Sequence, residues 1–156
     1  MAESVFIETT IPSYYVARPS RDVVQAARQQ LTIAWWTHKR KEFDLYSSEL
    51  VVTEVSRGDQ EMAEKRLELL DEARLLDLNE SVITIAKALV NSGIIPVKAA
   101  EDAVHISCAA VHGMDYLLTW NCRHIANPRI SRRVRKCLDE CGYDMPVICT
   151  PEEFEL

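Results

Sequence analysis

The sequence predicts an α/β fold built on a parallel sheet. Three observations indicate it: short apolar runs of strand length, segments of helical period between them, and polar residues where the apolar runs end. Strands that alternate with helices are typical of a parallel sheet covered by helices. With 156 residues, of which 47% are hydrophobic and 27% charged, the chain has the size and composition of one domain, residues 1–156.

Four segments have the length and residue types of buried strands. They are residues 5–7, 45–47, 116–120 and 146–149. The third is apolar or aromatic along almost its whole length, as expected for a strand with both faces covered. Pro12 follows the first segment and cannot continue a strand ladder, because proline donates no backbone hydrogen bond.

Helical periodicity fills the intervals between these strands. The predicted helices are residues 22–43, a short helix with Glu54 at or just inside its start, 63–73, 82–89, 97–112 and 129–141. Gly58 interrupts the short helix, and Gly142 is placed to cap the last long one. Thr150 begins a capping-box sequence with Pro151 and Glu153, which predicts a final helical turn.

The charge and cysteine content narrow the class of protein. A net charge of −6 argues against a general polyanion binder, because nonspecific nucleic-acid affinity comes largely from Lys and Arg. No export signal or run of about 20 apolar residues is visible. Five cysteines without a CxxC pair predict reduced thiols and a cytoplasmic protein. Cys137 and Cys141, four residues apart on a helix, lack evident further ligands for structural zinc.

Three acids and one amide accompany the ends of these apolar runs. Glu8 and Asn121 follow predicted strands, Glu54 follows the second strand region, and Asp102 lies near a helix start. Because ligands bind beyond the carboxyl ends of parallel strands, we expect the four side chains to meet there. Crowded carboxylates need a bound cation or shared protons, and this oxygen-rich set favours Mg²⁺ or Mn²⁺. The corresponding chemistry is phosphodiester hydrolysis.

Each acid also has a simpler interpretation as a solvated surface charge. Glu49 is the alternative to Glu54 as the acid of its segment. Glu101 is adjacent to Asp102 but points about 100° away on a helix, so we expect it to face solvent. His105 is either a ligand or a histidine packed under the sheet edge, and packing is the preferred interpretation.

Four segments together resemble the successive motifs of PIN-domain proteins, in particular toxins of the VapC type. They are residues 6–10, 52–58, 100–106 and 118–125, and they occur in the family's order over nearly the whole chain. The resemblance implies a three-layer α/β/α PIN-like fold with a central mostly parallel sheet. It also implies a metal-dependent endoribonuclease of bacterial or archaeal cells, with a small antitoxin protein as partner, and it suggests a homodimer.

Carried over by position, the resemblance gives individual residues their roles. Glu8, Glu54 and Asp102 become the acids that hold Mg²⁺ or Mn²⁺, and together with Asn121 they form the implied catalytic set. The residues expected to order the motifs or contact RNA are Thr10, Thr119, His124, Arg129 and Arg132. Two positions depart from the family: Glu8 replaces an aspartate, and His124 stands where a fourth aspartate is common, which removes negative charge from a second metal site.

Several alternatives remain open at this point. His124 contacts phosphate or caps its loop, and the basic stretch from Arg129 to Lys136 binds RNA or an acidic antitoxin tail, or is a solvated helix face. The aromatic side chains at 14, 15, 35 and 36 stack on bases or pack in the core or an oligomer interface. Two other functions compete with the endoribonuclease: a PIN-like binding protein with weakened catalysis, and a phosphatase. A phosphatase requires an Asp nucleophile, which this sequence lacks after its first strand.

Overall fold

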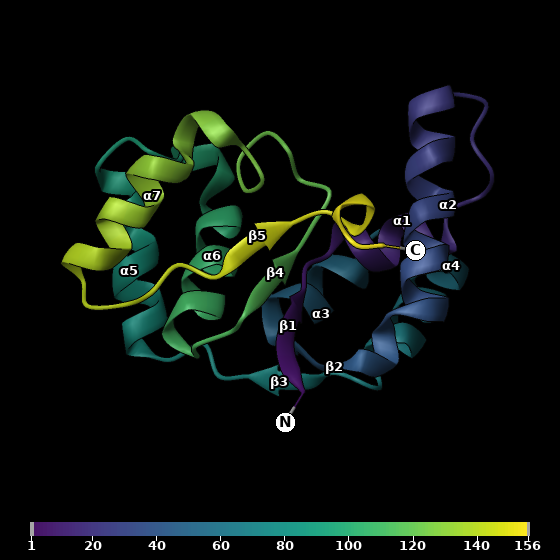
Figure 1. The fold of residues 1–156 in the computed structure, drawn as a ribbon, viewed down its shortest axis with the longest axis horizontal. Helices are drawn as coiled ribbons and strands as arrows, with labels where there is room; N and C mark the ends of the chain where they lie inside the picture. Colours follow the sequence, from purple (N-terminus) through teal and green to yellow (C-terminus); the bar gives the residue numbers. More distant parts are fainter. Residues whose placement is uncertain (1, 156) are drawn as a thin grey trace.

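The structure is a computed structural model that describes residues 2–155 (Figure 1). Its strands are β1 (Glu3–Ile7), β2 (Phe43–Ser48), β3 (Arg74–Leu76), β4 (Tyr116–Leu118) and β5 (Val147–Cys149). Its α-helices are α1 (Thr10–Val16), α2 (Val23–His38), α3 (Glu49–Val55), α4 (Gln60–Leu70), α5 (Glu80–Asn91), α6 (Ala100–Val111) and α7 (Pro128–Glu140). Three 3₁₀ turns complete it: η1 (Arg40–Glu42), η2 (Val97–Ala99) and η3 (Pro151–Glu153).

The five strands form one sheet in the order β3-β2-β1-β4-β5, and every pair is parallel. Val5 in the central strand pairs with Leu45 on one side and with Tyr116 on the other. The predicted parallel sheet is therefore confirmed. The chain first builds outward from β1 to β3 and then returns to place β4 on the other side of β1. The connections that leave β1 and β4 diverge, which creates a crevice at their carboxyl ends.

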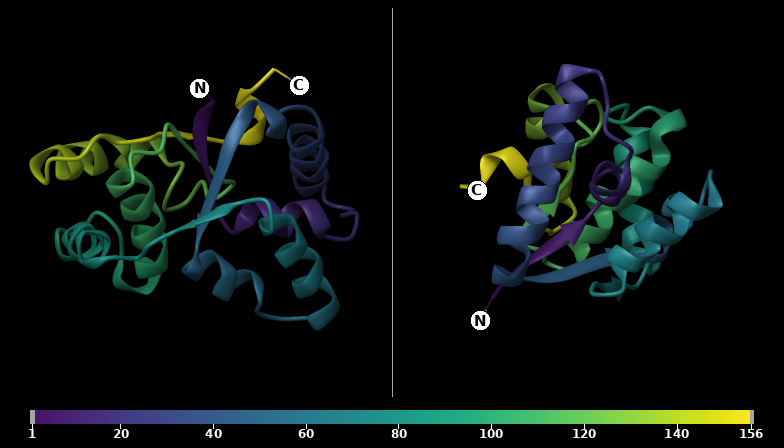
Figure 2. Two further views of the ribbon diagram at one scale, coloured as in Figure 1. Left: turned by 90° about the horizontal axis from the view of Figure 1, so that it is seen from below. Right: turned by 90° about the vertical axis from the view of Figure 1, so that its right-hand side faces the viewer.

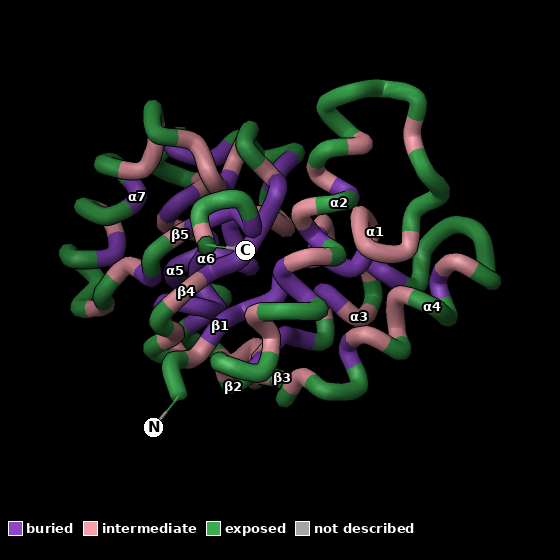
Figure 3. The backbone as a smooth tube through the Cα atoms, turned by 45° about the vertical axis from the view of Figure 1, so that its right-hand side comes forward, coloured by how far each residue is buried: buried purple, intermediate pink, exposed green. Residues whose placement is uncertain are grey.

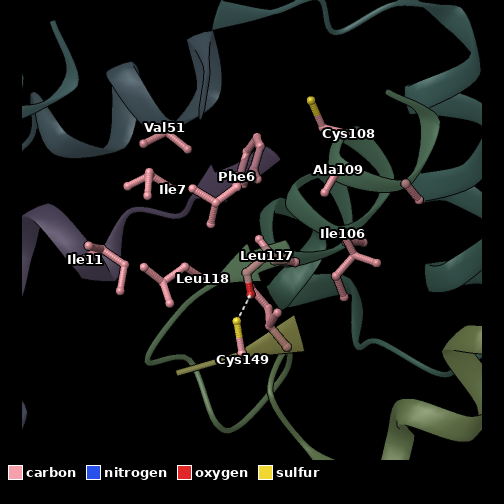
Figure 4. Close-up of a cluster of buried hydrophobic side chains, with 14 of the residues drawn as sticks. Phe6, Ile7, Ile11, Val51, Ile106, Cys108, Ala109, Leu117, Leu118 and Cys149 are labelled. Carbon is pink, nitrogen blue, oxygen red and sulfur yellow. Dashed lines mark hydrogen bonds between the residues drawn. The ribbon is translucent and has the colours of Figure 1, made fainter. Parts of the chain in front are cut away.

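Helices cover both faces of this sheet, as the three-layer prediction requires. Side chains alternate between faces along a strand, so Phe43 and Tyr116 lie on one face and Phe6 on the other. Trp35 of α2 stacks on Phe43 at 5.8 Å between ring centroids. On the opposite face Phe6 meets α6, where Figure 4 shows it near Ala109. Figure 2 shows the two helical layers from further directions.

The residues nearest the centre of the sheet are the most deeply buried. Val5, Phe6 and Ile7 of β1 and Leu117 and Leu118 of β4 have no exposed surface. Figure 3 shows these buried strands among helices whose buried residues face inward and whose exposed residues lie on the outside. Strands covered on both faces explain why the sequence reads as continuous apolar runs rather than alternating ones.

Helix ends follow the local chemistry of their sequences. Asp22 caps α2 by accepting a hydrogen bond from the backbone of Gln25, and Thr150 forms the predicted capping box with Glu153. Gly142 adopts a φ of +86° just after α7. The backbone N–H of Tyr143 then returns to Leu138 O at 2.9 Å, which is a Schellman ending.

Two elements were not predicted from the sequence. Helix α1 contains Pro12 at its third position, which is tolerated because the first backbone N–H groups of a helix have no partner within it. Strand β3 is a three-residue edge strand with exposed Arg74 and Leu75. Because this strand is short and largely exposed, its sequence lacks the longer apolar run that identifies a buried strand.

Two predicted positions are wrong. The helix predicted for residues 22–43 ends at His38, because the chain turns through η1 and Phe43 already belongs to β2. Glu54 lies in the last turn of α3 and not near its start. Ser48 caps that helix through the backbone of Val51, so the helix begins directly after β2.

Among the described residues, no helix combines the length and apolar character needed to cross a membrane. All five cysteines are free thiols, two of them exposed and two buried. Burial raises the pKa of Cys108 and of Cys149 to about 12. Since the thiolate is the reactive form, both should be chemically inert in the folded protein.

We expect iodoacetamide at pH 8 to modify the exposed Cys122 and Cys141 and to leave Cys108 and Cys149 unmodified. Peptide mass spectrometry of the native and the urea-unfolded protein measures this. All five should react after unfolding, when burial no longer raises the pKa. Rapid native modification of either buried thiol would contradict the packing of α6 or β5.

Candidate functional site

The candidate site lies at the carboxyl ends of β1 and β4, the crevice that the strand order creates. Glu8 is the first residue after β1, and its backbone N–H donates to Leu118 O of β4 at 3.2 Å. Thr119 and Asn121 follow β4. The sheet therefore brings together two of the predicted motifs that are more than a hundred residues apart in the chain.

Glu8 is buried, with 3% of its surface exposed, and is held by one of its two oxygens. Oε1 accepts hydrogen bonds from the hydroxyl of Thr119 at 2.7 Å, from the hydroxyl of Thr10 at 2.5 Å and from the Thr10 backbone at 3.1 Å. Oε2 accepts none from a described residue, yet it is not among the buried unpaired atoms. Oε2 is thus the part of Glu8 that still meets solvent.

The two threonines also join the first motif to the fourth. Thr10 Oγ1 accepts a hydrogen bond from the Trp120 backbone at 2.8 Å, and Thr119 Oγ1 accepts one from the Asn121 backbone at 2.8 Å. Each hydroxyl therefore donates to Glu8 while it accepts from the loop after β4. This reciprocal arrangement fixes the carboxylate and that loop relative to each other.

Glu54 reaches the site from the last turn of α3. Its Oε1 accepts hydrogen bonds from the Thr9 hydroxyl and from His105 Nε2, the latter at 2.6 Å. Burial alone would raise the pKa of Glu54, but the hydrogen bond and charge of His105, with Thr9 and Arg57, hold it below the ordinary value. Glu54 is therefore an ionised carboxylate at neutral pH.

The pKa values of Asp102 and Glu8, in contrast, are raised above their ordinary values. Burial raises the pKa of Glu8, although His105, Thr10 and Thr119 oppose it. Burial also raises the pKa of Asp102, against a hydrogen bond from Asn121 and the charges of His105 and His124. A cation next to either carboxylate would offset this desolvation and favour the charged form.

His105 is a buried imidazole in direct contact with one of the three acids, Glu54. It has no exposed surface, packs on Phe6 at 6.1 Å between ring centroids, and is one helical turn after Asp102 on α6. Burial lowers its pKa, but the hydrogen bond to Glu54 and the charges of Glu8, Glu54 and Asp102 raise it overall. Glu54 is thus the acid that contacts His105, and the charges of Glu8 and Asp102 act on the same imidazole without a direct bond.

Asn121 and His124 form the loop that leads from the site to α7. Asn121 Oδ1 accepts a hydrogen bond from the His124 backbone at 3.0 Å, and the Asn121 side chain lies near Asp102 and opposes the rise in the pKa of that carboxyl. His124 lies close enough to Asp102 for its charge to stabilise the carboxylate. Its backbone takes part in the loop turn, and its half-buried ring makes no hydrogen bond with a described residue.

Arg129 and Arg132 begin a basic face on α7. Arg129, Arg132, Arg133 and Lys136 follow the helical spacing i, i+3, i+4 and i+7, so they share one face. All four are exposed, and none forms an ion pair with a described residue. Helix α7 begins at Pro128, and the side chain of the preceding Asn127 caps it.

The carboxylate oxygens of the three acids are of the type that binds a hard cation, but the side chains do not form a preassembled metal site. Within residues 2–155, no three His, Cys, Asp or Glu side chains are placed together as a metal site. The free Oε2 atoms of Glu8 and Glu54 and the carboxylate of Asp102 are oxygen donors of the kind Mg²⁺ prefers. The donor chemistry therefore fits Mg²⁺ or Mn²⁺.

Sequence reasoning missed two contacts of the site. Thr9 donates its hydroxyl to Glu54, although Thr10 alone was assigned a role in the first motif. His105 is packed against the sheet, as the preferred interpretation of the sequence predicted, but it also forms a hydrogen bond with Glu54. The available signal was its position: a polar residue one turn after Asp102 in an otherwise small and apolar stripe.

The remaining predicted acids and aromatics fall outside the site. Glu49 is exposed at the start of α3, and Glu101 pairs with Arg57 at 3.2 Å. Trp35 and Trp36 are buried and belong to the core, so the proposal that they stack on bases is wrong. Tyr14 is half-buried against Trp120 at 6.1 Å.

Comparison with known proteins places the fold. No family model matches the chain, and no curated protein matches its sequence. A solved structure does: the crystal structure of VapBC2 from Rickettsia felis bound to a DNA fragment from their promoter. The similarity covers 94% of this chain and 97% of that one, with a TM-score of 0.60 and 15% sequence identity. At this identity the similarity shows the fold alone, and that fold agrees with the predicted three-layer α/β/α PIN-like fold.

Proposed function

We propose that this protein is a metal-dependent endoribonuclease of the VapC type, the toxin of a toxin–antitoxin pair. One observation carries the proposal: a series of hydrogen bonds joins the segments that hold the three acids. Glu8 bonds Thr119 after β4, while the adjacent Thr9 bonds Glu54, which in turn bonds His105 one helical turn after Asp102. Buried carboxylates are costly, and a fold retains several at one place where they bind something positive.

A bound Mg²⁺ or Mn²⁺ would supply an activated water and neutralise charge on a scissile phosphate. The chain's own residues prepare the acids for it. Thr10 and Thr119 restrain Glu8 through Oε1 and leave Oε2 available. In the loop after β4, Asn121 accepts a hydrogen bond from the His124 backbone and lies near Asp102.

The basic face of α7 is the proposed path of the RNA. The protein carries a net charge of −6, so phosphates need a local surface of opposite sign. Arg129 and Arg132 supply it on the helix that begins directly after the site loop. His124, between the two, is placed to meet a phosphate near Asp102.

The proposed partner is a small cognate antitoxin. The similar structure is described as VapBC2 bound to promoter DNA, and we extend such a complex to this chain. We also propose a homodimer and a cytoplasmic location, the latter in line with five free thiols.

A second function is favoured by a specific observation. Oε1 of Glu8 and Oε1 of Glu54 accept hydrogen bonds from hydroxyl, amide and imidazole donors. In the described part of the chain, no three His, Cys, Asp or Glu side chains are placed together as a metal site. A PIN-like module that binds RNA or a partner without cleaving it would have such a site. The two functions differ in their metal-dependent activity.

We expect Asp102→Asn to abolish RNA cleavage in the presence of Mg²⁺, by on the order of 100-fold or more, because it removes a charged oxygen ligand. Glu101→Gln is the matched control: it changes the adjacent acid, a half-exposed side chain that pairs with Arg57 and bonds none of the predicted catalytic residues, and should retain activity. Cleavage of RNA by antitoxin-free protein measures both. Equal loss in the two variants, or no cleavage by the unaltered protein with Mg²⁺ or Mn²⁺, would contradict the nuclease.

A second matched pair lies on α3. Glu54→Gln should reduce cleavage and Mn²⁺ affinity, since it removes the ionised carboxylate, whereas Glu49→Gln on the exposed start of the same helix should change neither. Isothermal titration with Mn²⁺ and the RNA assay separate the two. If Glu49→Gln proved the damaging substitution, the assignment of the helix's functional acid would be reversed.

Arg129→Gln and Arg132→Gln should each weaken RNA binding and reduce the slope of log K against log salt by about 0.7, the value for one phosphate contact on a single strand. Binding is measured in the Asp102→Asn background, where RNA stays intact. Arg74→Gln is the control, because this exposed arginine lies in the edge strand β3, which β2 separates from β1 and β4. Identical salt slopes in all three variants would remove α7 from the RNA path.

A further inference from the structure

We propose that His105 is a positioning residue that holds Glu54 by one carboxylate oxygen and thereby presents the other to the ligand. This inference rests on the proposed function, because it assigns a task at the same site. His105 touches neither RNA nor metal in this account; it acts through Glu54.

The first argument is the geometry at Glu54 Oε1. His105 Nε2 lies 2.6 Å from this oxygen, and the hydroxyl of Thr9 donates to the same atom. The donors come from different segments, one from α6 and one from the turn before α1. Two donors on Oε1 fix the rotation of the carboxylate, and Oε2 accepts no hydrogen bond from a described residue.

The second argument is that the hydrogen bond does not depend on the charge of the imidazole. An imidazole nitrogen that faces a carboxylate oxygen must carry a proton, and Nε2 does so in the cation and in one neutral tautomer. His105 is therefore a donor to Glu54 in either state. Its carboxylate partner selects the tautomer, as partners of ligand-orienting histidines do.

The third argument is that packing alone does not explain a histidine here. Nδ1 is one of two buried side-chain atoms without a hydrogen-bond partner among the described residues. Burying an unpaired polar atom destabilises a protein, and a leucine in this space against Phe6 would avoid that cost. A group that costs stability and bonds a site carboxylate is typical of a functional residue.

The consequence is a mechanical link between two of the acids. Asp102 and His105 lie one turn apart on α6, so they move together with that helix. His105 ties Glu54 of α3 to the same helix. The spacing of the two acids is thus set by α6 and does not depend on the flexible side chain of Glu54 alone.

The experiment compares His105→Leu, His105→Gln and Glu54→Gln, with the double variant of His105→Leu and Glu54→Gln. Leucine removes the donor, whereas the glutamine amide places an N–H close to where Nε2 was. We expect His105→Leu to unfold in urea at an equal or higher concentration, and to bind Mn²⁺ about 10- to 100-fold more weakly. His105→Gln should restore most of the affinity, and the double variant should be no weaker than Glu54→Gln.

The outcomes separate this inference from the proposed function. If the unaltered protein cleaves RNA and His105→Leu binds Mn²⁺ equally well, positioning is overturned and the nuclease stands. If the unaltered protein neither binds Mn²⁺ nor cleaves RNA, the nuclease fails, and with it the task assigned to His105. If His105→Leu does not fold, Thr9→Val removes the other donor to the same carboxylate oxygen. Unchanged Mn²⁺ affinity of Thr9→Val then overturns the proposal.

Discussion

The structure depends on the cost of keeping carboxylates in a largely apolar crevice. Glu8 directly follows the central strand and is buried almost completely, so it persists only because Thr10 and Thr119 donate to it. Those same hydroxyls accept from the backbone of the loop after β4. The requirement to satisfy one carboxylate therefore also joins the first and fourth motifs, and this junction sits where the strand order reverses.

Glu8 and Glu54 are held by the same pattern of hydrogen bonds. Each is fixed through Oε1 by two side-chain donors and leaves Oε2 unbonded by the described residues. Such an arrangement pre-orients a ligand atom without occupying it, which lowers the cost of ordering the site when a cation arrives. His105 serves as the interior donor for Glu54, and its charge interacts with all three acids. The site thus consists of two hydrogen-bonded groups, Glu8 with Thr10 and Thr119 and Glu54 with Thr9 and His105, and the basic face of α7 follows its last loop.

The fold was largely predictable from the sequence, because buried parallel strands and amphipathic helices leave strong local patterns. Helix α1 and strand β3 are absent from the sequence prediction, because Pro12 argues against a helix and β3 is a three-residue edge strand that is largely exposed. The positions of Glu8, Asp102 and Asn121 followed from their places after strands or at a helix start. The hydrogen bond from His105 to Glu54 could not be predicted, because it joins residues 51 apart whose contact depends on how α3 and α6 pack.

The most direct measurement of the central claim is a crystal of the protein grown with Mn²⁺ and examined by anomalous scattering. The account predicts a manganese peak bounded by Oε2 of Glu8, by Glu54 and by Asp102, with His105 still bonded to Glu54 behind it. A peak at another surface would contradict it. So would a crevice without manganese at concentrations that support RNA cleavage.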